Sequence, residues 1–514
     1  MAEENTKHPM EVELKLRLPP AGRTELELHP ALQAPHATAP EERHEVTTYF
    51  DTPDLALAGE GVTLRVRRSG DHRVQTVKLR GAGHAVAARR GEWEWPIERD
   101  TPDLALLAET PAGAAVGDLA GKGLEPVFVT DIRRTVRELR VDETTTAEAA
   151  LDEGTITAGA ASEAVSELEL ELRDGTLAPL YRLALDLHAA VPLTIGPESK
   201  ADRGYRLRTG RAPLARKAPD LDLDRGIGVP EAFREIVAAG LGHLLANQPA
   251  AAVGDPEGVH QMRVAIRRLR TALVLFETHL EPHATARFEA ELKRHGRVLG
   301  EARDWDVFCF ETLPKALDDA PGAGWEHLVR EAAETERRAA HRRVEEEIGR
   351  PALTGFVLGM AAWAEDGVTR PALLGDKRMG RRLAKLAPEL LDRLAGKVAK
   401  RGKRIGRRSD EELHALRKSL KKLRYGVDDL AGLYGRKAAK AYLGGCKELQ
   451  ELLGGMNDAA VAGALAERLD AGDGAGLAPA VGALARWSEK RRDKASRHLS
   501  DAWAKFRKAS PFWS

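Results

Sequence analysis

Polar and apolar residues alternate along the first 207 positions of the chain. In the segment EVELKLRL (residues 11–18), Glu11, Glu13, Lys15 and Arg17 stand at every second position, with aliphatic residues between them. Side chains two apart share one face of a strand. The alternation recurs, between Gly, Pro and Asp breakers, in EVTTYFDT, VTLRVRRSG, VQTVKLRG, GEWEWPIE, EPVFVTDIRRTVREL, AALDEGTITAG and SELELELRDG. The pattern predicts eight strands, typical of a closed antiparallel barrel.

Apolar residues spaced three and four apart predict helices elsewhere. Two short helices are expected within the barrel domain, near residues 102–120 and 176–190. Residues 208–230 are rich in Pro, Gly and charge, which indicates a linker. From residue 231 onward the sequence predicts helices only. The expected fold is therefore α+β and multidomain, with a flexible segment 1–10, a barrel domain 11–207, a linker 208–230 and an all-α domain 231–510.

The helical part contains an internal repeat. EGVHQMRVAIRRLR (257–270) matches EELHALRKSLKKLR (411–424), so His260 and His414 are 154 positions apart. LGEARDWDV and LGGMNDAAV match at the same offset. An offset that does not drift predicts two copies of one helical bundle, at about 231–375 and 376–510.

Composition narrows the class of protein. A chain of 514 residues is long enough for two or three domains. No apolar run approaches a membrane span of about 20 residues, and the first ten residues lack the features of a signal peptide, so a cytoplasmic location is expected. The two cysteines, Cys309 and Cys446, exclude a disulfide framework and a cysteine zinc site.

Charge is distributed unevenly although the net charge is zero. Residues 1–225 carry 29 Lys and Arg against 39 Asp and Glu, whereas residues 226–514 carry 50 against 40. The acidic and the basic halves are expected to have different roles.

Ionisable residues occupy one face of the predicted strands. Examples are Arg65 with Arg67, Lys78 with Arg80, and the run Glu167, Glu169 and Glu171. An ordinary barrel would point these charges to water. The alternative places them in a central tunnel, where they would require a polar occupant. A polyanion with a divalent cation fits, because Arg and Lys pair with phosphate and carboxylates bind Mg²⁺ or Mn²⁺.

These segments resemble the CYTH family of triphosphate tunnel metalloenzymes. The resemblance extends from residue 11 to about 207 and rests on EVELK, YFDT, LRVRR, TVKLRG, RRGEWEW, TDIRRTV, LDEG, ELELEL and ESKADRGY. It implies an eight-stranded antiparallel tunnel that acts on a triphosphate-containing substrate with a divalent metal.

The resemblance also assigns residues. It implies metal binding by Glu11 and Glu13 and by a second carboxylate pair, taken as Glu169 and Glu171, although the register leaves Glu167 open. Asp131 stands where some members carry a base, which weakens phosphate binding there or shifts it to Arg134. The implied phosphate-binding bases are Lys15, Arg65, Arg67, Lys78, Arg133 and Lys200, and further motif positions without a fixed role are Arg90, Glu92, Glu94, Asp152 and Arg203.

Two matching basic stripes mark the helical half. His260, Arg263, Arg267 and Arg270 lie at i, i+3, i+7 and i+10, hence along one side of a helix. The second copy repeats the stripe with His414, Arg417, Lys421 and Arg424. A lone basic stripe usually faces solvent, but two copies at one offset favour an anion site.

The stripes, with HQMRVAIRRLR and ARDWDV, resemble the CHAD family of helical domains. The resemblance covers about 231–510 and implies binding of inorganic polyphosphate, in some members at polyphosphate granules. Nucleic acid fits less well, because the stripes lack aromatic residues for base stacking and Asn or Gln for base-edge contacts. His260 and His414 also remain compatible with ordinary buried histidines.

The sequence therefore predicts a Mg²⁺- or Mn²⁺-dependent hydrolase of inorganic triphosphate or polyphosphate, with a helical domain that binds polyphosphate. Two alternatives stay open: a polyphosphate-binding protein without turnover, and a tunnel enzyme that acts on a nucleoside or thiamine triphosphate.

Overall fold

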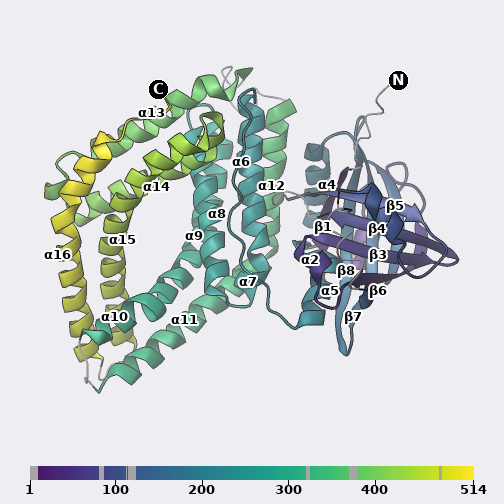
Figure 1. Ribbon diagram of the computed structural model, residues 1–514, viewed down its shortest axis with the longest axis horizontal. Coiled ribbons are helices and arrows are strands. Elements are labelled where there is room, and N and C mark those ends of the chain that lie inside the picture. Colours follow the sequence, from purple (N-terminus) through teal and green to yellow (C-terminus); the bar gives the residue numbers. More distant parts are fainter. Residues whose placement is uncertain are drawn as a thin grey trace. The chain divides into compact units, whose positions relative to one another are not determined.

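The chain divides into two compact units. The computed structural model describes residues 10–79, 86–111, 113, 123–319, 324–369, 380–473 and 477–513. The first unit comprises Met1–Leu214 with Gly349–Glu365, and the second comprises Ala215–Ile348 with Asp366–Ser514. Every described strand lies in the first unit, and the second unit is helical (Figure 1). The division at Leu214 falls within the predicted linker.

All eight predicted strands are present in the first unit. Its elements in chain order are β1 (Met10–Arg17), α1 (Arg23–Glu27), η1 (Pro30–Leu32), β2 (Glu41–Asp51), α2 (Ala56–Gly59), β3 (Val62–Ser69), β4 (His72–Leu79), β5 (Ala88–Pro96), η2 (Leu104–Glu109), β6 (Glu125–Arg140), β7 (Thr146–Ala158), β8 (Ala161–Asp174), α4 (Leu177–Ala190), β9 (Thr194–Ile195) and α5 (Lys200–Thr209).

The strands form one antiparallel sheet in the order β5-β4-β3-β2-β6-β7-β8-β1-β9. An additional pairing joins β5 to β1, with Met10 opposite Gly91. The sheet has nine strands rather than the predicted eight, because Thr194 and Ile195 pair with β1 as a two-residue strand. So short a strand leaves no alternation that could be read from the sequence.

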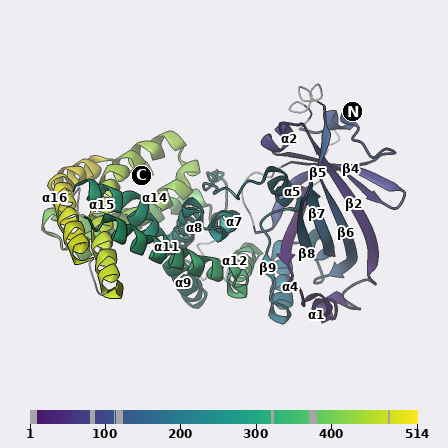
Figure 2. The ribbon, with the colours of Figure 1, turned by 90° about the horizontal axis from the view of Figure 1, so that it is seen from below.

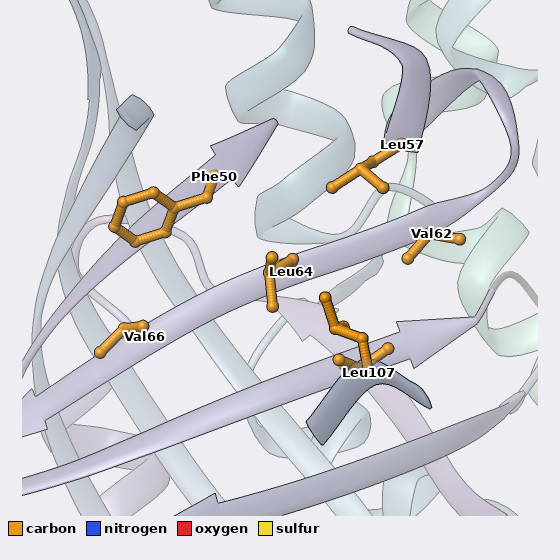
Figure 3. Close-up of a cluster of buried hydrophobic side chains, with 7 residues drawn as sticks. Phe50, Leu57, Val62, Leu64, Val66 and Leu107 are labelled. Atoms are coloured by element: carbon orange, nitrogen blue, oxygen red, sulfur yellow. The ribbon is translucent and has the colours of Figure 1, made fainter. Parts of the chain in front are cut away.

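The apolar side chains of strands β3 and β4 lie on the outer face of the sheet. Leu64 and Val66 of β3 and Val77 of β4 belong to a buried cluster, and Figure 3 shows the β3 residues beside Leu57 of α2 and Leu107 of η2. Burial of such side chains stabilises each by about 1.5–3 kcal/mol. The charged residues that alternate with them are thereby directed to the inner face.

One of the two helices expected in this unit is confirmed, and the other falls partly outside the described residues. The helix near 176–190 is α4. In the region near 102–120 the described residues include the 3-10 helix Leu104–Glu109 and the helical residue Gly113, whereas residues 112 and 114–122 lie outside the described part. Asp103 accepts a hydrogen bond from the Ala105 amide and so begins the short helix.

Helix α5 was not expected, and it carries two predicted site residues at its start. Ser199 and Asp202 form a capping box, in which each side chain accepts a hydrogen bond from the other residue's backbone amide. This cap fixes the first turn, which contains Lys200 and Arg203. The helix packs against β6, β7 and β8 (Figure 2).

The helices of the second half keep the repeat of the sequence. Three of them begin 154 residues after their counterparts: α13 at 383 against α6 at 229, α14 at 410 against α8 at 256, and α15 at 436 against α9 at 282. The elements are α6 (Val229–Ala246), α7 (Gln248–Ala252), α8 (Pro256–Leu275), α9 (Pro282–Val307), the π-helix η4 (Phe308–Thr312), α10 (Leu313–Asp318), α11 (Glu326–Gly349), α12 (Pro351–Thr369), α13 (Leu383–Gly402), η7 (Ile405–Arg407), α14 (Asp410–Leu430), η8 (Ala431–Leu433), α15 (Arg436–Asp473) and α16 (Ala478–Lys508).

Part of α12 groups with the first unit, up to Glu365. There the Ile195 amide of β9 donates a hydrogen bond of 3.1 Å to Thr354 Oγ1. Among the described helices, none has both the length and the apolar character needed to cross a membrane. Cys309 and Cys446 are both free.

Candidate functional site

Strand β1 supplies the first charged side chains of the inner face. Leu14 and Leu16 are fully buried on its other face, which directs Glu13 and Lys15 inward. In the pairing with β8, Glu13 stands opposite Glu171 and Lys15 opposite Glu169. Lys15 Nζ lies 2.7 Å from Glu13 and also contacts Glu169. The predicted alternation thus produces a row in which acids and bases touch.

Lys200 lies among three buried carboxylates. Oxygen atoms of Asp152, Glu167 and Glu169 lie within 4.8 Å of one another. Lys200 Nζ contacts all three and is 2.6 Å from Asp152 and 2.8 Å from Glu169. We call these four residues the Lys200 cluster. Although the three carboxylates have the spacing of a metal site, an ammonium group already bridges them.

Two arginines complete the charge balance of the Lys200 cluster. Arg134 donates hydrogen bonds of 2.6 Å to Asp152 and 2.7 Å to Glu169. Arg203 lies 3.1 Å from Glu167. Burial by itself would raise the pKa of Glu169, but Lys15, Lys200 and Arg134 hold that pKa well below its usual range. Burial would lower the pKa of Lys200, yet Asp152, Glu169 and Glu167 raise it overall.

A second acidic group lies around Glu171 and has too few bases. Glu148 stands opposite Glu171 on β7, and Glu13 stands opposite it on β1. Burial raises the pKa of Glu171 to about 7, with Glu11, Glu148 and Glu13 adding to the shift and Arg173 opposing it. We call Glu11, Glu13, Glu148 and Glu171 the Glu171 cluster. Its surplus of carboxylate oxygens fits a hard divalent cation.

Strands β3, β4 and β5 form a wall of paired charges on the same inner face. Lys78 Nζ lies 2.7 Å from Glu11 and 3.1 Å from Glu92. Arg65 lies 3.4 Å from the same Glu92. Arg67 pairs with Glu94 at 3.4 Å and with Glu45 of β2 at 3.8 Å. Burial would lower the pKa of Arg65, but Tyr49 and Glu92 raise it overall, so its charge is secure.

The structure separates the two adjacent arginines of β6. Arg134 points inward, whereas Arg133 is exposed on the other face, in register with His44 of β2 and Glu153 of β7. The expectation that Arg133 lines the tunnel is therefore not met, because neighbouring strand residues alternate between faces. Arg134 takes that place. The side chain of Arg90 lies outside the described part.

Sequence reasoning brought most of these residues together but missed three partners. They are Glu45, Glu148 and Arg173. Glu45 stands two positions before Thr47 on the alternating strand β2, so the register of β2 with β3 would have found it. Sequence reasoning also chose Glu171 as the partner of Glu169. The structure instead groups Glu169 with Glu167 and Asp152 in the buried triad.

The basic stripes of the second unit converge on each other. Helix α8 packs against α14. Burial, Arg417, Arg267 and Arg263 together lower the pKa of Lys421 to about 7, which Asp458 opposes. Arginines of both copies thus lower the pKa of one lysine. We call Arg263, Arg267, Arg417 and Lys421 the basic cluster.

The ends of the stripes are partly neutralised. Burial, Arg303 and Arg267 lower the pKa of His260 to about 4, and His414 Nδ1 lies 2.8 Å from Asn457. Arg270 lies 3.6 Å from Glu289. The described residues provide no third ligand that would make either histidine a metal site.

One tyrosine that sequence reasoning did not single out lies among three arginines. The Tyr425 ring is buried, and the guanidinium groups of Arg267, Arg268 and Arg424 lie 5.9, 5.7 and 4.9 Å from its centroid. Such contacts hold guanidinium groups in place without neutralising them. At the equivalent position of the first copy stands Thr271, so the repeat gave no signal for it.

Comparison with known proteins matches both parts of the chain to families. The CYTH domain model matches residues 9–205, and the CHAD domain model matches residues 235–467. An inorganic triphosphatase from Haemophilus influenzae is 32% identical over 161 residues, which are 31% of this chain. The chain spans 45% of the length of that relative.

Two solved structures are also similar. The CHAD domain from the plant Ricinus communis has 30% identity and a TM-score of 0.49, covering 58% of this chain and 98% of its own. A Hippeastrum protein described as an adenylyl cyclase with a dominant triphosphatase activity has 21% identity and a TM-score of 0.29, covering 39% of this chain and 96% of its own.

Proposed function

The chain carries a domain of the CYTH family at residues 9–205 and a domain of the CHAD family at residues 235–467, and from this premise we propose that it is a divalent-metal-dependent triphosphatase that also binds polyphosphate. The first unit hydrolyses inorganic triphosphate or polyphosphate, and the second holds the polymer. The proposal includes a location in the cytoplasm, at polyphosphate granules where these form.

The observation that carries the hydrolase proposal is the mixed row of acids and bases on the inner face. Lys78, Arg65, Lys15 and Arg134 each touch a carboxylate within 3.4 Å. A phosphate chain alone would be repelled by these carboxylates, and a cation alone by the bases. A metal-bound phosphate chain is attracted by both. The arrangement thus selects a substrate and cation that enter together.

The bases of the inner face bind and orient the phosphate chain. Lys78 and Arg65 both pair with Glu92. Phosphate oxygens can therefore take the place of this one carboxylate beside both side chains. Arginine offers a planar fork of donors that matches phosphate oxygens. Arg134, held by Asp152 and Glu169, is fixed in position before substrate arrives. Fixed donors stabilise the charge that spreads over the phosphoryl group as the bond breaks.

The Glu171 cluster fits the divalent cation better than the Lys200 cluster does. Glu11, Glu13 and Glu171 would hold Mg²⁺ or Mn²⁺, because together with Glu148 they make four carboxylates against three bases. These bases are Lys15, Lys78 and Arg173. Such an ion neutralises phosphate charge and makes a bound water more acidic. In the Lys200 cluster, Lys200 occupies the position between the acids. Its buried salt bridges fix Glu169 beside Lys15 and thereby position the row.

In the second unit, the basic cluster binds polyphosphate. No carboxylate of the described residues forms an ion pair with Arg267 or Lys421 within 4.0 Å, although both are largely buried among other bases. Bases that lower each other's pKa values gain free energy when an anion lies between them. A polymer of phosphates without bases fits this site, since the Tyr425 ring beside Arg267 is buried and offers no exposed face for nucleobase stacking.

A substrate panel tests the proposal. Purified chain with Mg²⁺ or Mn²⁺ is assayed for phosphate release from tripolyphosphate, long-chain polyphosphate, ATP and thiamine triphosphate at pH 6 to 10. We expect the highest kcat/KM for tripolyphosphate or polyphosphate, no release with EDTA, and a loss of at least about 100-fold in Glu13→Ala. Glu153→Gln, an outer-face acid paired with Arg23, is the matched control. Release from none of the four substrates would reject the enzyme and leave a binding protein.

A further inference from the structure

Each copy of the helical repeat pairs one arginine of its basic stripe with one aspartate. Arg263 Nη1 lies 3.0 Å from Asp304 and 2.8 Å from the Gly300 carbonyl oxygen. Arg417 Nη2 lies 3.9 Å from Asp458. In both copies the aspartate follows its arginine by 41 positions, and the copies are related by the offset of 154. The pairs are therefore a feature of the repeat, not of one copy.

The two aspartates come from different copies but line one hollow. It lies between the end of α9 with η4 and the helix α15. Val307 and Val461, which are also 154 positions apart, stand beside the aspartates in its lining. The side chains of Asp304 and Asp458 are 40% and 45% exposed. Both carboxylates are thus accessible from the same hollow.

The aspartates are the acids that act on the basic cluster. Burial by itself lowers the pKa of Arg417; Asp458 and Asp304 oppose that shift, whereas Arg267 and Arg263 add to it. The charge of Asp304 therefore raises the pKa of an arginine, Arg417, that belongs to the other copy. Four bases face two carboxylates, and the cluster keeps a surplus of positive charge. An anion that approaches Arg263 or Arg417 meets a carboxylate already in contact with that arginine.

We propose that Asp304 and Asp458 are resident counter-ions that an incoming phosphate chain must displace, and that they set the minimum chain length the basic cluster accepts. This inference rests on the polyphosphate binding proposed above. A short phosphate that contacts Arg263 and Arg417 meets the repulsion of both carboxylates. A long chain also contacts Arg267, Lys421 and the bases at the stripe ends, so the same repulsion is a smaller part of its binding free energy. Such discrimination against short anions by repulsion is a known route to specificity.

If the aspartates only orient their arginines, replacing them should change the anion affinity in the opposite direction. If each carboxylate mainly holds its arginine in the binding conformation, its replacement by an amide weakens anion binding. If it acts as a counter-ion, the same replacement removes a repulsive charge while the amide oxygen still accepts the arginine hydrogen bond. Binding then becomes tighter, and most of all for short chains.

The test is calorimetric titration of the full chain in EDTA, which prevents metal-dependent hydrolysis, with tripolyphosphate and with polyphosphate of about 100 units. For Asp304→Asn combined with Asp458→Asn, we expect affinity to rise about tenfold for tripolyphosphate and about threefold for the long chain. Asp410→Asn is the matched control, because Asp410 pairs with Arg492 at 2.8 Å outside the basic cluster. The gain must disappear when Arg263→Ala and Arg417→Ala are added, because these are the arginines that the two aspartates pair with, and this loss separates the gain from binding in the first unit.

The outcomes are distinct. Unchanged or weaker binding by the double variant, with wild-type binding intact and thermal unfolding unaltered, overturns the counter-ion role. An equal gain for both ligands overturns the chain-length role. Wild-type chain that binds neither ligand in this way contradicts polyphosphate binding itself, and the inference fails with it.

Discussion

The two charged regions of this chain differ in how their bases are compensated. On the inner face of the sheet, every base discussed above touches a carboxylate, and Lys200 touches three. In the basic cluster of the helical repeat, Arg267 and Lys421 have no carboxylate partner among the described residues, and the pKa of Lys421 falls to about 7. Both regions are proposed to bind phosphate, one from a balanced set of charges and the other from a surplus of positive charge.

The difference suggests a physical division of labour. A balanced site binds a phosphate chain weakly unless a cation comes with it, and its fixed donors stabilise charge that develops during bond breaking. An unbalanced site gains free energy when an anion neutralises it, which favours tight binding. This division of labour is wrong if either region performs the other's role.

The largest expected effect concerns the balance of the first region. Lys200→Met leaves three buried carboxylates without their shared ammonium, so the free energy of unfolding should fall by about 3 kcal/mol and phosphate release should be lost. Chemical denaturation measures the first and a phosphate assay the second. Arg208→Met is the control, because Arg208 is exposed on α5 and pairs with the half-buried Glu125 at 3.6 Å, and it should change stability by less than about 1 kcal/mol. Full activity with added Mn²⁺ in Lys200→Met would show that the Lys200 cluster is a metal site.

The next effect separates the two arginines of β6. Arg134→Ala should lower kcat/KM for tripolyphosphate about 100-fold, because its guanidinium lies within 2.7 Å of Glu169 on the inner face. Arg133→Ala should leave kcat/KM within about twofold, because that side chain is exposed on the outer face. Steady-state kinetics at saturating metal measures both. The reverse order of effects would mean that β6 is shifted by one residue.

A smaller effect is expected from reducing the surplus charge of the second region. Arg267→Ala with Lys421→Ala should weaken long-chain polyphosphate binding about 30-fold and reduce the log–log salt slope by about 1.4, if the polymer behaves like a single-stranded polyanion. Titrations at several salt concentrations give both numbers. Lys403→Ala with Arg407→Ala removes two exposed bases elsewhere in the same unit and should leave the slope nearly unchanged.

The smallest effect is a pH dependence that Lys421 imposes. Because its pKa is lowered to about 7, Lys421 carries its charge below that pH and loses it as the pH rises through it. Polyphosphate affinity should therefore fall about threefold between pH 6 and pH 8. His260 does not contribute, since its pKa of about 4 leaves it neutral throughout. Lys421→Arg should bind equally at both pH values, and a pH dependence that persists in this variant would assign it to another group.

The sequence predicted the elements well where a pattern repeats over many residues. Alternation identified all eight long strands, and the offset of 154 reappears in the first residues of α6 and α13, α8 and α14, and α9 and α15. It failed for β9, which is two residues long, and gave no sign that residues 104–109 form a 3-10 helix. Short elements depend on tertiary contacts more than on local pattern.

The sequence predicted which residues form the site but not which of them contact one another. Alternation placed Glu167, Glu169 and Glu171 on one face, but only the position of α5 shows that Lys200 joins Glu167 and Glu169 and leaves Glu171 with Glu11 and Glu13. The choice between Arg133 and Arg134 depends on the register of β2 with β6, which contains an irregularity at Tyr49 and Phe50. Side-chain partners across several strands are set by such registers, which the sequence of one strand does not contain.

The most direct test of the divided roles applies two measurements to the wild type and to three variants. Wild type, Glu13→Gln, Arg267→Ala with Lys421→Ala, and the triple variant are each assayed for phosphate release from tripolyphosphate and for binding of long-chain polyphosphate. We predict that Glu13→Gln abolishes release and leaves binding unchanged, and that the double variant weakens binding and leaves the kcat for tripolyphosphate unchanged. A Glu13→Gln chain that loses polyphosphate binding, or a double variant that loses the kcat for tripolyphosphate, would contradict the division of labour.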